Sequence, residues 1–374
     1  MKKINTSPSA GTQGGDKSST TMTSQERRSS GALALIFALR MLGLFLVLPV
    51  FMLEARKYPG GDDPAMIGLA MGMYGLTQAV FQLPIGLASD RIGRKRVIVA
   101  GLLVFAAGSL IAAMADSLTG LMVGRAIQGA GAVSAAVTAL LADLTRDGVR
   151  TKAMAMVGGS IGLMFALALV LAPLLNAWIG LSGIFGLTCA LAMAGIAVVL
   201  WVVPPEPTQH ANAPKGKFSD LLGQKDLLRL NFGVFILHTV QMSMWVAVPA
   251  MLVQAGLVKE QHWHIYLPAV LLSFLAMGML FSMERKGKLR KALLGAIGLV
   301  LVVQIGLGML AASGTIPTVW CMALLMFLFF CGFNALEATQ PSLVSRMAPA
   351  PLRGAALGVY NTLQSLGLFA GGAI

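Results

Sequence analysis

The sequence has 374 residues, of which 56% are hydrophobic and only 11% are charged, and its formal net charge is +13. A soluble domain usually carries about a quarter charged residues, so this composition excludes an ordinary soluble protein. The three cysteines lie inside apolar runs and show neither a disulfide framework nor metal-ligand spacing. The apolar residues cluster into runs of about 20, the length that a helix needs to cross a bilayer.

Each of these runs is predicted to form a transmembrane helix. In chain order they are 31–53, 65–87, 97–114, 119–141, 153–175, 183–203, 231–254, 264–282, 292–312, 318–341 and 354–374. A β-barrel would instead show short segments of alternating polarity, and no such alternation is present. The sequence therefore predicts an all-α polytopic membrane protein with eleven spans.

The basic residues are distributed unevenly between the two sides of the predicted membrane. If the amino terminus is cytoplasmic, 23 of the 28 Lys and Arg residues fall on the cytoplasmic side. Such an excess is typical of the cytoplasmic loops of membrane proteins and fixes the predicted orientation. The positive charge therefore indicates contact with anionic lipid headgroups, and we expect no nucleic-acid partner.

The chain divides into two predicted bundles separated by a linker. Residues 1–30 are rich in Ser, Thr and Gly and are expected to form a disordered cytoplasmic tail. Residues 31–203 hold six spans, and residues 231–374 hold five. Between them, residues 204–230 combine a Pro-rich start with an amphipathic stretch, which predicts a cytoplasmic linker with an interfacial helix.

Two pairs of similar sequence segments, one member in each predicted bundle, support this division. DRIGRKR at 90–96 recurs in weaker form as ERKGKLR at 284–290, and VRTKAMAM at 149–156 resembles LRGAALGV at 352–359. Both pairs are offset by six spans, which predicts two parallel, pseudo-symmetric six-helix bundles, as in many transporters. Twelve spans are then expected, so the sequence is predicted to be truncated after the eleventh.

A charged turn follows the second span. The stretch GLASDRIGRKR, residues 86–96, fits Gly-x-x-x-Asp-Arg-x-Gly-x-Lys-Arg and resembles motif A of the major facilitator superfamily. The matching residues are Gly86, Asp90, Arg91, Gly93, Arg94, Lys95 and Arg96. The resemblance implies a latch that braces the two bundles beside Arg353, with Asp143 pairing with the motif A arginines. The alternative is a plain basic turn on the cytoplasmic side.

Span four carries a second motif. RAIQGAGA at 125–132 resembles motif B of the same superfamily, through Arg125, Gln128 and Gly129. Arg125 and Gln128 are three residues apart and so share a helix face. The resemblance implies that Arg125 takes part in proton coupling, whereas a snorkelling arginine is the alternative. In span five most glycines of the antiporter motif C are missing, so the choice between symport and antiport stays open.

Further polar residues inside the spans are candidates for a cavity. Arg40 lies near the middle of span one, where a charge is costly unless it faces water or a partner. Tyr74, Gln78 and Gln82 recur at helical spacing on span two. The complete set of cavity and substrate candidates is Arg40, Tyr74, Gln78, Gln82, Gln241, Trp245, Asn334, Tyr360 and Asn361. A purely structural polar cluster is the alternative.

Two side chains are candidates for carrying a proton. Glu337 is the only acid well inside a span, and burial generally favours the protonated form of a carboxyl group. His238 lies in span seven, and imidazole is the side chain that changes charge nearest neutral pH. For both residues the alternative is a packing role with satisfied hydrogen bonds.

The resemblance covers essentially the whole chain after residue 30 and is nearest to the drug–proton antiporter branch of the superfamily. It implies the major facilitator fold and a secondary active transporter in the bacterial inner membrane. Transport would be driven by the proton gradient, with no other cofactor, and the protein is expected to be a monomer. The expected cargo is a small lipophilic or amphipathic molecule, exported by alternating access.

Three other functions compete with this interpretation. A proton-coupled carrier of a sugar or another metabolite is compatible with the polar residues on spans two and seven. A sensor or scaffold that has lost transport would not need two intact motifs. A membrane enzyme is disfavoured, because the spans contain no paired carboxylates, metal cluster or nucleophile–base set.

Overall fold

The apolar runs fold as long helices, and the residues between them set where each helix begins and ends. The structure, a computed structural model, describes residues 21–206, 223–348 and 352–374; within these, the side chains at 90, 147, 148, 151, 276–282, 284, 285, 353 and 354 fall outside the description. The described part contains helices and no strand, which confirms the all-α prediction.

The amino-terminal bundle is formed by the first helices of the chain. They are α1 (Ser24–Ala55), α2 (Pro64–Ile92), α3 (Arg94–Ala113), α4 (Leu118–Ala130), α5 (Ser134–Asp143) and α6 (Asp147–Trp201). Helix α6 contains two predicted spans, because Gly180, with φ of 67°, bends it back into the bundle. Eight described helices are long and apolar enough to cross a membrane, and α6 is counted once among them.

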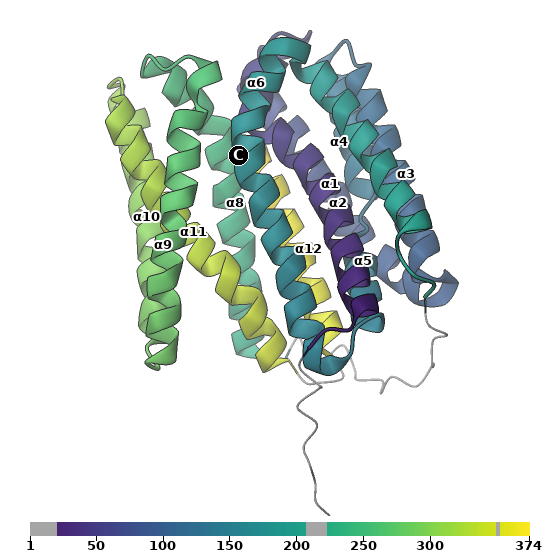
Figure 1. Ribbon diagram of the computed structural model, residues 1–374. Coiled ribbons are helices and arrows are strands. Elements are labelled where there is room, and N and C mark those ends of the chain that lie inside the picture. Colours follow the sequence, from purple (N-terminus) through teal and green to yellow (C-terminus); the bar gives the residue numbers. More distant parts are fainter. Residues whose placement is uncertain (1–20, 207–222, 349–351) are drawn as a thin grey trace, which may run out of the picture.

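The carboxy-terminal bundle follows the linker. Its elements are α8 (Lys225–Gln254), the short 3₁₀ helix η2 (Lys259–Gln261), α9 (Trp263–Arg285), α10 (Leu289–Ser313), α11 (Val319–Met347) and α12 (Arg353–Ala373). In Figure 1 the helices of both bundles run roughly side by side between two opposite faces of the molecule. Ten of the eleven predicted spans coincide with one of these helices or with part of one, and span four covers both α4 and α5.

Two predicted boundaries are wrong by about two turns. Helix α1 begins at Ser24, so residues 24–30 are not part of a disordered tail, because Thr23 and Glu26 form a capping box that starts the helix early. Helix α8 begins at Lys225, so residues 225–230 belong to span seven and not to the linker. Residues 207–222, which include most of the linker and the start of its predicted amphipathic stretch, lie outside the described residues.

Span four is not one continuous helix. It breaks between α4 and α5, where the glycine-rich sequence of motif B interrupts the helical backbone. The chain approaches α3 closely here, because a side chain on Gly131 would collide with the Gly101 carbonyl oxygen and lie 2.9 Å from the Phe105 nitrogen. At the break, the backbone between α4 and α5 therefore packs directly against the backbone of α3.

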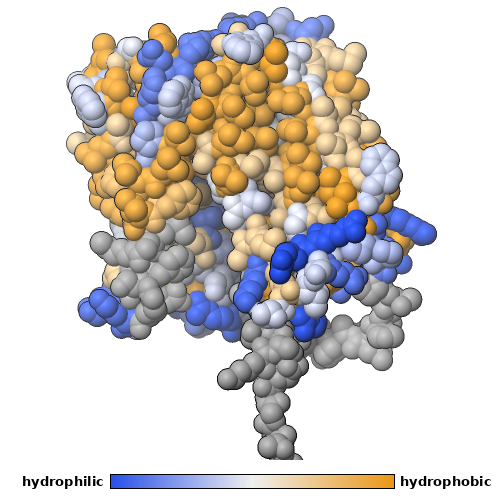
Figure 2. Space-filling model, viewed as in Figure 1, coloured by the Kyte–Doolittle hydropathy of each residue, from blue (hydrophilic) through white to orange (hydrophobic). Residues whose placement is uncertain are grey.

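The exterior is apolar between the two faces. Figure 2 shows hydrophobic residues over most of the visible side, with hydrophilic residues gathered towards the top and bottom. Large side chains such as Leu163, Trp178, Leu301 and Trp320 are exposed, the two tryptophans by 87% and 86%. Exposed apolar area of this extent is unfavourable in water and is expected for helices that face lipid.

The two faces of the molecule are distinguished by how the bundles share their cores. We call the face where α1 begins, and where α2, α5 and α11 end, the basic face, and the opposite one the Glu54 face. Towards the Glu54 face, one hydrophobic cluster joins residues of both bundles, including Phe51, Met71, Trp245 and Phe330. Towards the basic face, each bundle has a separate cluster. Among the described residues, the bundles therefore share a hydrophobic core at the Glu54 face and keep separate ones at the basic face.

Helix α12 makes the closest approach between the bundles. A side chain on Gly72 of α2 would lie 2.8 Å from the Phe369 carbonyl oxygen of α12, and one on Gly75 would lie 2.5 Å from that of Ser365. On its other side, α12 packs against α8, where a side chain on Gly367 would lie 3.1 Å from the Cβ atom of His238. Small residues thus allow the backbone of α12 to approach the backbones of α8 and α2 closely.

Candidate functional site

The motif A turn connects α2 to α3 at the basic face. Gly93 ends α2 and caps α3 with φ of 102°, a conformation that favours glycine. The Arg94 Nε atom donates to Asp143 Oδ2 at 3.2 Å, so the predicted partner of the motif is in contact with it. Arg94 also donates to the Ser89 hydroxyl at 2.8 Å. This turn is thereby tied to the end of α5.

The other motif A residues have different surroundings. Arg91 and Arg96 are exposed, and Gly86 faces Ala135 of α5. The side chain of Asp90 and that of its predicted neighbour Arg353 lie outside the described side chains.

The start of the linker also binds the motif A turn. Glu206 Oε2 accepts a hydrogen bond from the Arg94 backbone N–H at 2.7 Å and so caps α3. Lys95 Nζ donates to the Val203 carbonyl oxygen, at the end of α6, at 2.9 Å. We did not predict either contact, because 112 residues separate Glu206 from Arg94 and the sequence carries no local signal for such a pair.

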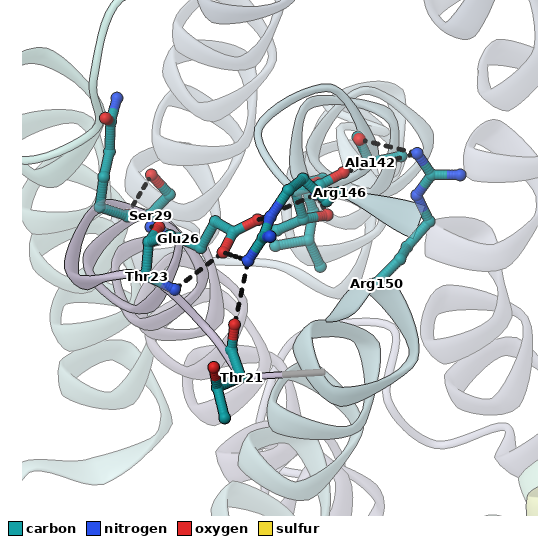
Figure 3. Close-up of polar contacts among 10 residues, drawn as sticks. Thr21, Thr23, Glu26, Ser29, Ala142, Arg146 and Arg150 are labelled. Carbon is teal, nitrogen blue, oxygen red and sulfur yellow. Dashed lines mark hydrogen bonds and ion pairs between the residues drawn. The ribbon is translucent and has the colours of Figure 1, made fainter. Parts of the chain in front are cut away.

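A second ion pair holds α1 against the start of α6 (Figure 3). Glu26 Oε1 accepts from Arg146 Nε at 2.8 Å and from its backbone N–H at 3.1 Å, while Oε2 accepts from Arg146 Nη2 at 3.0 Å. Arg146 also donates to the Thr21 carbonyl oxygen. Asp143 lies three residues before Arg146, so the Arg94–Asp143 pair and α1 are linked through one short turn.

The motif B residues form a buried cluster of polar side chains within the amino-terminal bundle. The Arg125 guanidinium is only 1% exposed and donates to Gln128 Oε1 at 3.0 Å and to the Met71 carbonyl oxygen at 3.3 Å. Its centre also lies 4.9 Å from the ring centroid of Tyr74. Gln128 in turn donates to the Ser109 hydroxyl at 2.8 Å. The charge is thus buried with hydrogen-bond partners rather than snorkelling to the surface.

Arg40 shares a partner with Arg125. Its Nη2 atom donates to the Tyr74 hydroxyl at 2.9 Å and its Nη1 atom to Ser134 Oγ at 3.1 Å. The Phe105 ring lies 5.3 Å from the guanidinium. Tyr74 therefore touches one arginine with its hydroxyl and the other with its ring face, which stabilises two buried cations in a bundle with few acids.

The predicted glutamines of α2 lie along the same helix. Gln82 is 2% exposed, and Gln78 is half-buried. Among the described residues, the side-chain oxygens of both are buried without a hydrogen-bond partner. Buried unpaired amide oxygens are unfavourable, so these two positions are suited to a cargo or water that donates hydrogen bonds.

The two predicted proton carriers lie together in the carboxy-terminal bundle. His238 Nε2 of α8 is 3.5 Å from Glu337 Oε2 of α11. Gln364 of α12, which we did not predict, donates to His238 Nε2 at 2.7 Å and to Glu337 Oε1 at 3.2 Å. The histidine side chain is 4% exposed and the glutamate side chain 36% exposed. A titratable pair is therefore bridged by a residue of the helix that joins the bundles.

The remaining candidates for the cavity do not line one common space. Asn334 donates to Ser273 Oγ at 2.7 Å, and the buried Tyr360 donates to Gln340 Oε1 at 3.3 Å. Gln241 and Asn361 are half-buried. Trp245 is 4% exposed and belongs to the hydrophobic core rather than to an open cavity.

Trp245 packs in an aromatic cluster that crosses between the bundles. The Phe165 ring of α6 lies 6.2 Å from Trp245 and 6.0 Å from Phe330, both in the carboxy-terminal bundle, and 5.1 Å from Phe45 of α1. All are edge-on contacts of the kind that stabilise aromatic pairs. This cluster contributes to the core shared by the two bundles.

A polar contact joins the bundles at the Glu54 face. Glu54 accepts from Lys259 Nζ across the interface at 2.5 Å. It also accepts from Lys57 Nζ at 2.5 Å and from Asn176 Nδ2 at 2.9 Å within its own bundle. The sequence showed Glu54 only as an acid near the end of a span, so this contact was not predicted.

Comparisons with known proteins agree with this architecture. A profile of the Major Facilitator Superfamily matches residues 31–372. The inner membrane transport protein YajR of Escherichia coli is 46% identical, over 94% of this chain and 78% of its own length. The multidrug resistance protein MdtH of Aeromonas salmonicida is 28% identical, over 91% and 84%. The solved nucleoside transporter NupG, in its D323A form, has the same fold, with a TM-score of 0.73, 14% identity, and coverage of 93% and 90%.

Proposed function

Since this chain belongs to the Major Facilitator Superfamily and is a multi-pass membrane transporter rather than an enzyme, we propose that it exports small lipophilic or amphipathic molecules in exchange for protons. The observation that carries the proposal is the His238–Gln364–Glu337 cluster. A histidine and a carboxylate within 3.5 Å of each other can take up and release a proton. A relative named as a multidrug resistance protein supports export as the direction.

The arrangement of the cores supports alternating access. The bundles share one core at the Glu54 face and have separate cores at the basic face. In the proposed cycle the cargo enters from the basic face, the bundles then rock together there, and the contacts at the Glu54 face break. The motif A turn, held at the basic face by Asp143 and Glu206, lies where this closure takes place.

The proposed direction follows from the distribution of charge. Of the Lys and Arg residues that the structure describes, the great majority lie at the basic face, where α1 begins, and we propose that this face is cytoplasmic. The relative named as an inner membrane protein supports a bacterial inner-membrane location. Cargo that enters at the basic face and leaves at the Glu54 face is thus exported.

A second candidate is a carrier of a polar metabolite. The unpaired amide oxygens of Gln78 and Gln82 favour it, because the hydroxyl groups of a sugar or nucleoside could donate to them. The solved nucleoside transporter shares the fold, and the fold alone does not decide between the two cargoes. The aromatic cluster around Phe165 and the scarcity of acids in the spans favour an uncharged or lipophilic cargo.

Proteoliposomes with a pH-sensitive dye inside test the proposal. Ethidium serves as a lipophilic probe, and xylose and uridine serve as polar probes. We expect ethidium to cause proton movement opposite to its own in the wild type and not in Glu337→Gln. The matched control Asp226→Asn, at an exposed acid of the same bundle, should behave as the wild type. Proton movement with xylose or uridine but not with ethidium would favour the metabolite carrier. If no probe causes proton movement, proton-coupled transport of both classes of cargo is contradicted.

A further inference from the structure

The side-chain amide of Gln364 donates hydrogen bonds to two acceptors, which lie on two different helices. Its Nε2 atom lies 2.7 Å from His238 Nε2 on α8 and 3.2 Å from Glu337 Oε1 on α11. An amide nitrogen carries two hydrogens, so it can donate one to each neighbour. Gln364 thereby fastens α12 to both other helices at a single point.

The hydrogen bonds assign the tautomer of His238 in this arrangement. His238 Nδ1 lies 3.0 Å from the Val234 carbonyl oxygen, which can only accept, so Nδ1 carries a hydrogen. In the neutral ring Nε2 is then an acceptor, as the Gln364 amide requires. Glu337 Oε1 accepts as well, while Oε2, buried at 3.5 Å from Nε2, has no hydrogen-bond partner among the described residues. This is the hydrogen-bond pattern of a neutral histidine beside a glutamate that accepts through Oε1.

A proton on the imidazole would reverse the role of Nε2. The protonated Nε2 is a donor, and it cannot share the contact with the N–H of Gln364. The unpaired Oε2 of Glu337 is the acceptor within reach, so the imidazolium and the carboxylate would form an ion pair. With Nε2–H paired to Glu337, the N–H of Gln364 must withdraw from the imidazole, and α12 then loses its fastening to α8.

The other groups around His238 do not compete for this proton. From α11, the Phe333 ring packs edge-on at 5.8 Å, and from α12, Tyr360 is bound to Gln340. Helices α1 and α2 also touch α8, and each of their buried titratable groups has a partner of its own. Arg40 is bound to Tyr74, Glu54 to Lys259 at the Glu54 face, and Glu26 to Arg146 at the basic face.

The position of Gln364 in α12 connects this site with the interface between the bundles. The next residue, Ser365, presents its carbonyl oxygen to Gly75 of α2 in the other bundle. We propose that Gln364 is a positioning residue that couples protonation of the His238–Glu337 pair to the seating of α12 between α8 and α2. This inference rests on the proposed proton coupling and adds the residue through which the proton would act on the bundles.

Electron spin resonance distances in lipid nanodiscs test the inference without a cargo. Spin labels are placed on Arg28→Cys and Lys291→Cys, exposed positions at the basic face of the two bundles, in a chain whose native cysteines are replaced by alanine. The distance distribution is recorded between about pH 5.5 and 8.5, around the range in which histidine titrates. In the wild type we expect the populations to shift with pH.

Two variants of Gln364 test its role in different ways. Gln364→Leu removes the fastening, and we expect loss of the pH-dependent shift. Gln364→Glu keeps the size but replaces the N–H donor with a second acceptor oxygen, so we expect its distance distribution to depart from the wild-type curve. Gln304→Leu is the matched control, because among the described residues the amide of Gln304 donates to Met244 Sδ and to no titratable group.

The outcomes separate this inference from the proposed function. If the wild type shifts with pH and both Gln364 variants follow the wild-type curve, the role of Gln364 is overturned and proton coupling stands. If the wild-type distances do not change with pH, proton coupling of the bundles fails and the inference fails with it. Thermal unfolding of each variant shows whether a lost response comes from a misfolded chain.

Discussion

Glu54 of α1 and Lys259 of η2 form an ion pair of 2.5 Å that joins the two bundles at the Glu54 face. The glutamate side chain is 7% exposed and the lysine side chain 34% exposed. The Glu54 carboxylate raises the pKa of Lys259 above its usual range, so the lysine is charged throughout the physiological range. Together with the core that surrounds Phe51 and Trp245, this pair holds the Glu54 face closed.

Loss of the lysine should therefore open that face. In Lys259→Met the contact between the bundles is lost, and we expect the open population to rise by about fivefold, which corresponds to about 1 kcal/mol for a partly exposed pair. The measurement is the rate at which an impermeant thiol reagent labels Met71→Cys, a buried position of the shared core. Lys57→Met is the matched control, since Lys57 binds the same carboxylate from within the same bundle. Equal labelling rates in the two variants would contradict a role of Lys259 between the bundles.

His262 should make the protein less stable in acid. This side chain is 1% exposed, and burial lowers its pKa below the usual value. The unfolded chain therefore binds more protons, so the stabilisation is complete above about pH 6.5 and is lost as the pH falls through the lower pKa of the folded state. We expect His262→Gln to flatten the acid side of a plot of melting temperature against pH. His264→Gln, at an exposed neighbouring position, should keep the wild-type slope; an unchanged slope in His262→Gln would show that other groups dominate.

Gly129 of motif B should not accept a larger side chain. A Cβ atom there would collide with the Tyr74 carbonyl oxygen and the Thr77 hydroxyl on α2. Gly129→Ala is expected to separate α4 from α2 at a cost of about 1–3 kcal/mol and to lower the melting temperature by several degrees. Gly158→Ala, where the structure shows open space, should be neutral or slightly stabilising. The prediction fails if both variants melt with the wild type.

Glu206 should protect the first turn of α3. Its carboxylate accepts from the Arg94 N–H, and Glu206→Gln weakens this cap by about 1 kcal/mol, which predicts about fivefold faster hydrogen exchange at the start of α3. Mass spectrometry of the peptide that contains residues 93–97 measures the rate. Asp226→Asn removes an exposed acid beyond the linker and should leave that peptide unchanged. Unchanged exchange in Glu206→Gln would show that the linker does not cap the motif A turn.

The sequence predicted the features that depend on local pattern. Long apolar runs gave the spans, and the spacing of residues 86–96 and 125–132 placed two motifs correctly at a basic turn and inside span four. Helical periodicity also placed Arg125 beside Gln128. The break in span four was missed, because glycines such as Gly131 are common inside membrane helices and do not by themselves show where backbones approach closely.

The contacts that were missed join residues far apart in the chain. Glu26 and Arg146 are 120 residues apart, and Glu54 and Lys259 are 205 apart. Each acid lies near the end of a helix, where the sequence alone indicates no more than a cap or a solvated charge. The role of Gln364 was missed for another reason. The sequence does not show which acceptors lie near an uncharged polar residue of a membrane helix, because packing of the other helices brings them there.

The most direct measurement of alternating access is a reversible cross-link across the Glu54 face. Cysteines at Glu54 and Lys259 are joined by a bifunctional reagent with a cleavable disulfide, and proton-coupled ethidium export is followed in proteoliposomes. Cysteines at Glu54 and Lys57, joined in the same way within one bundle, provide the control. We predict that the first link stops export, that reduction restores it and that the second link has no effect. Export at the unlinked rate with the bundles joined would contradict the account.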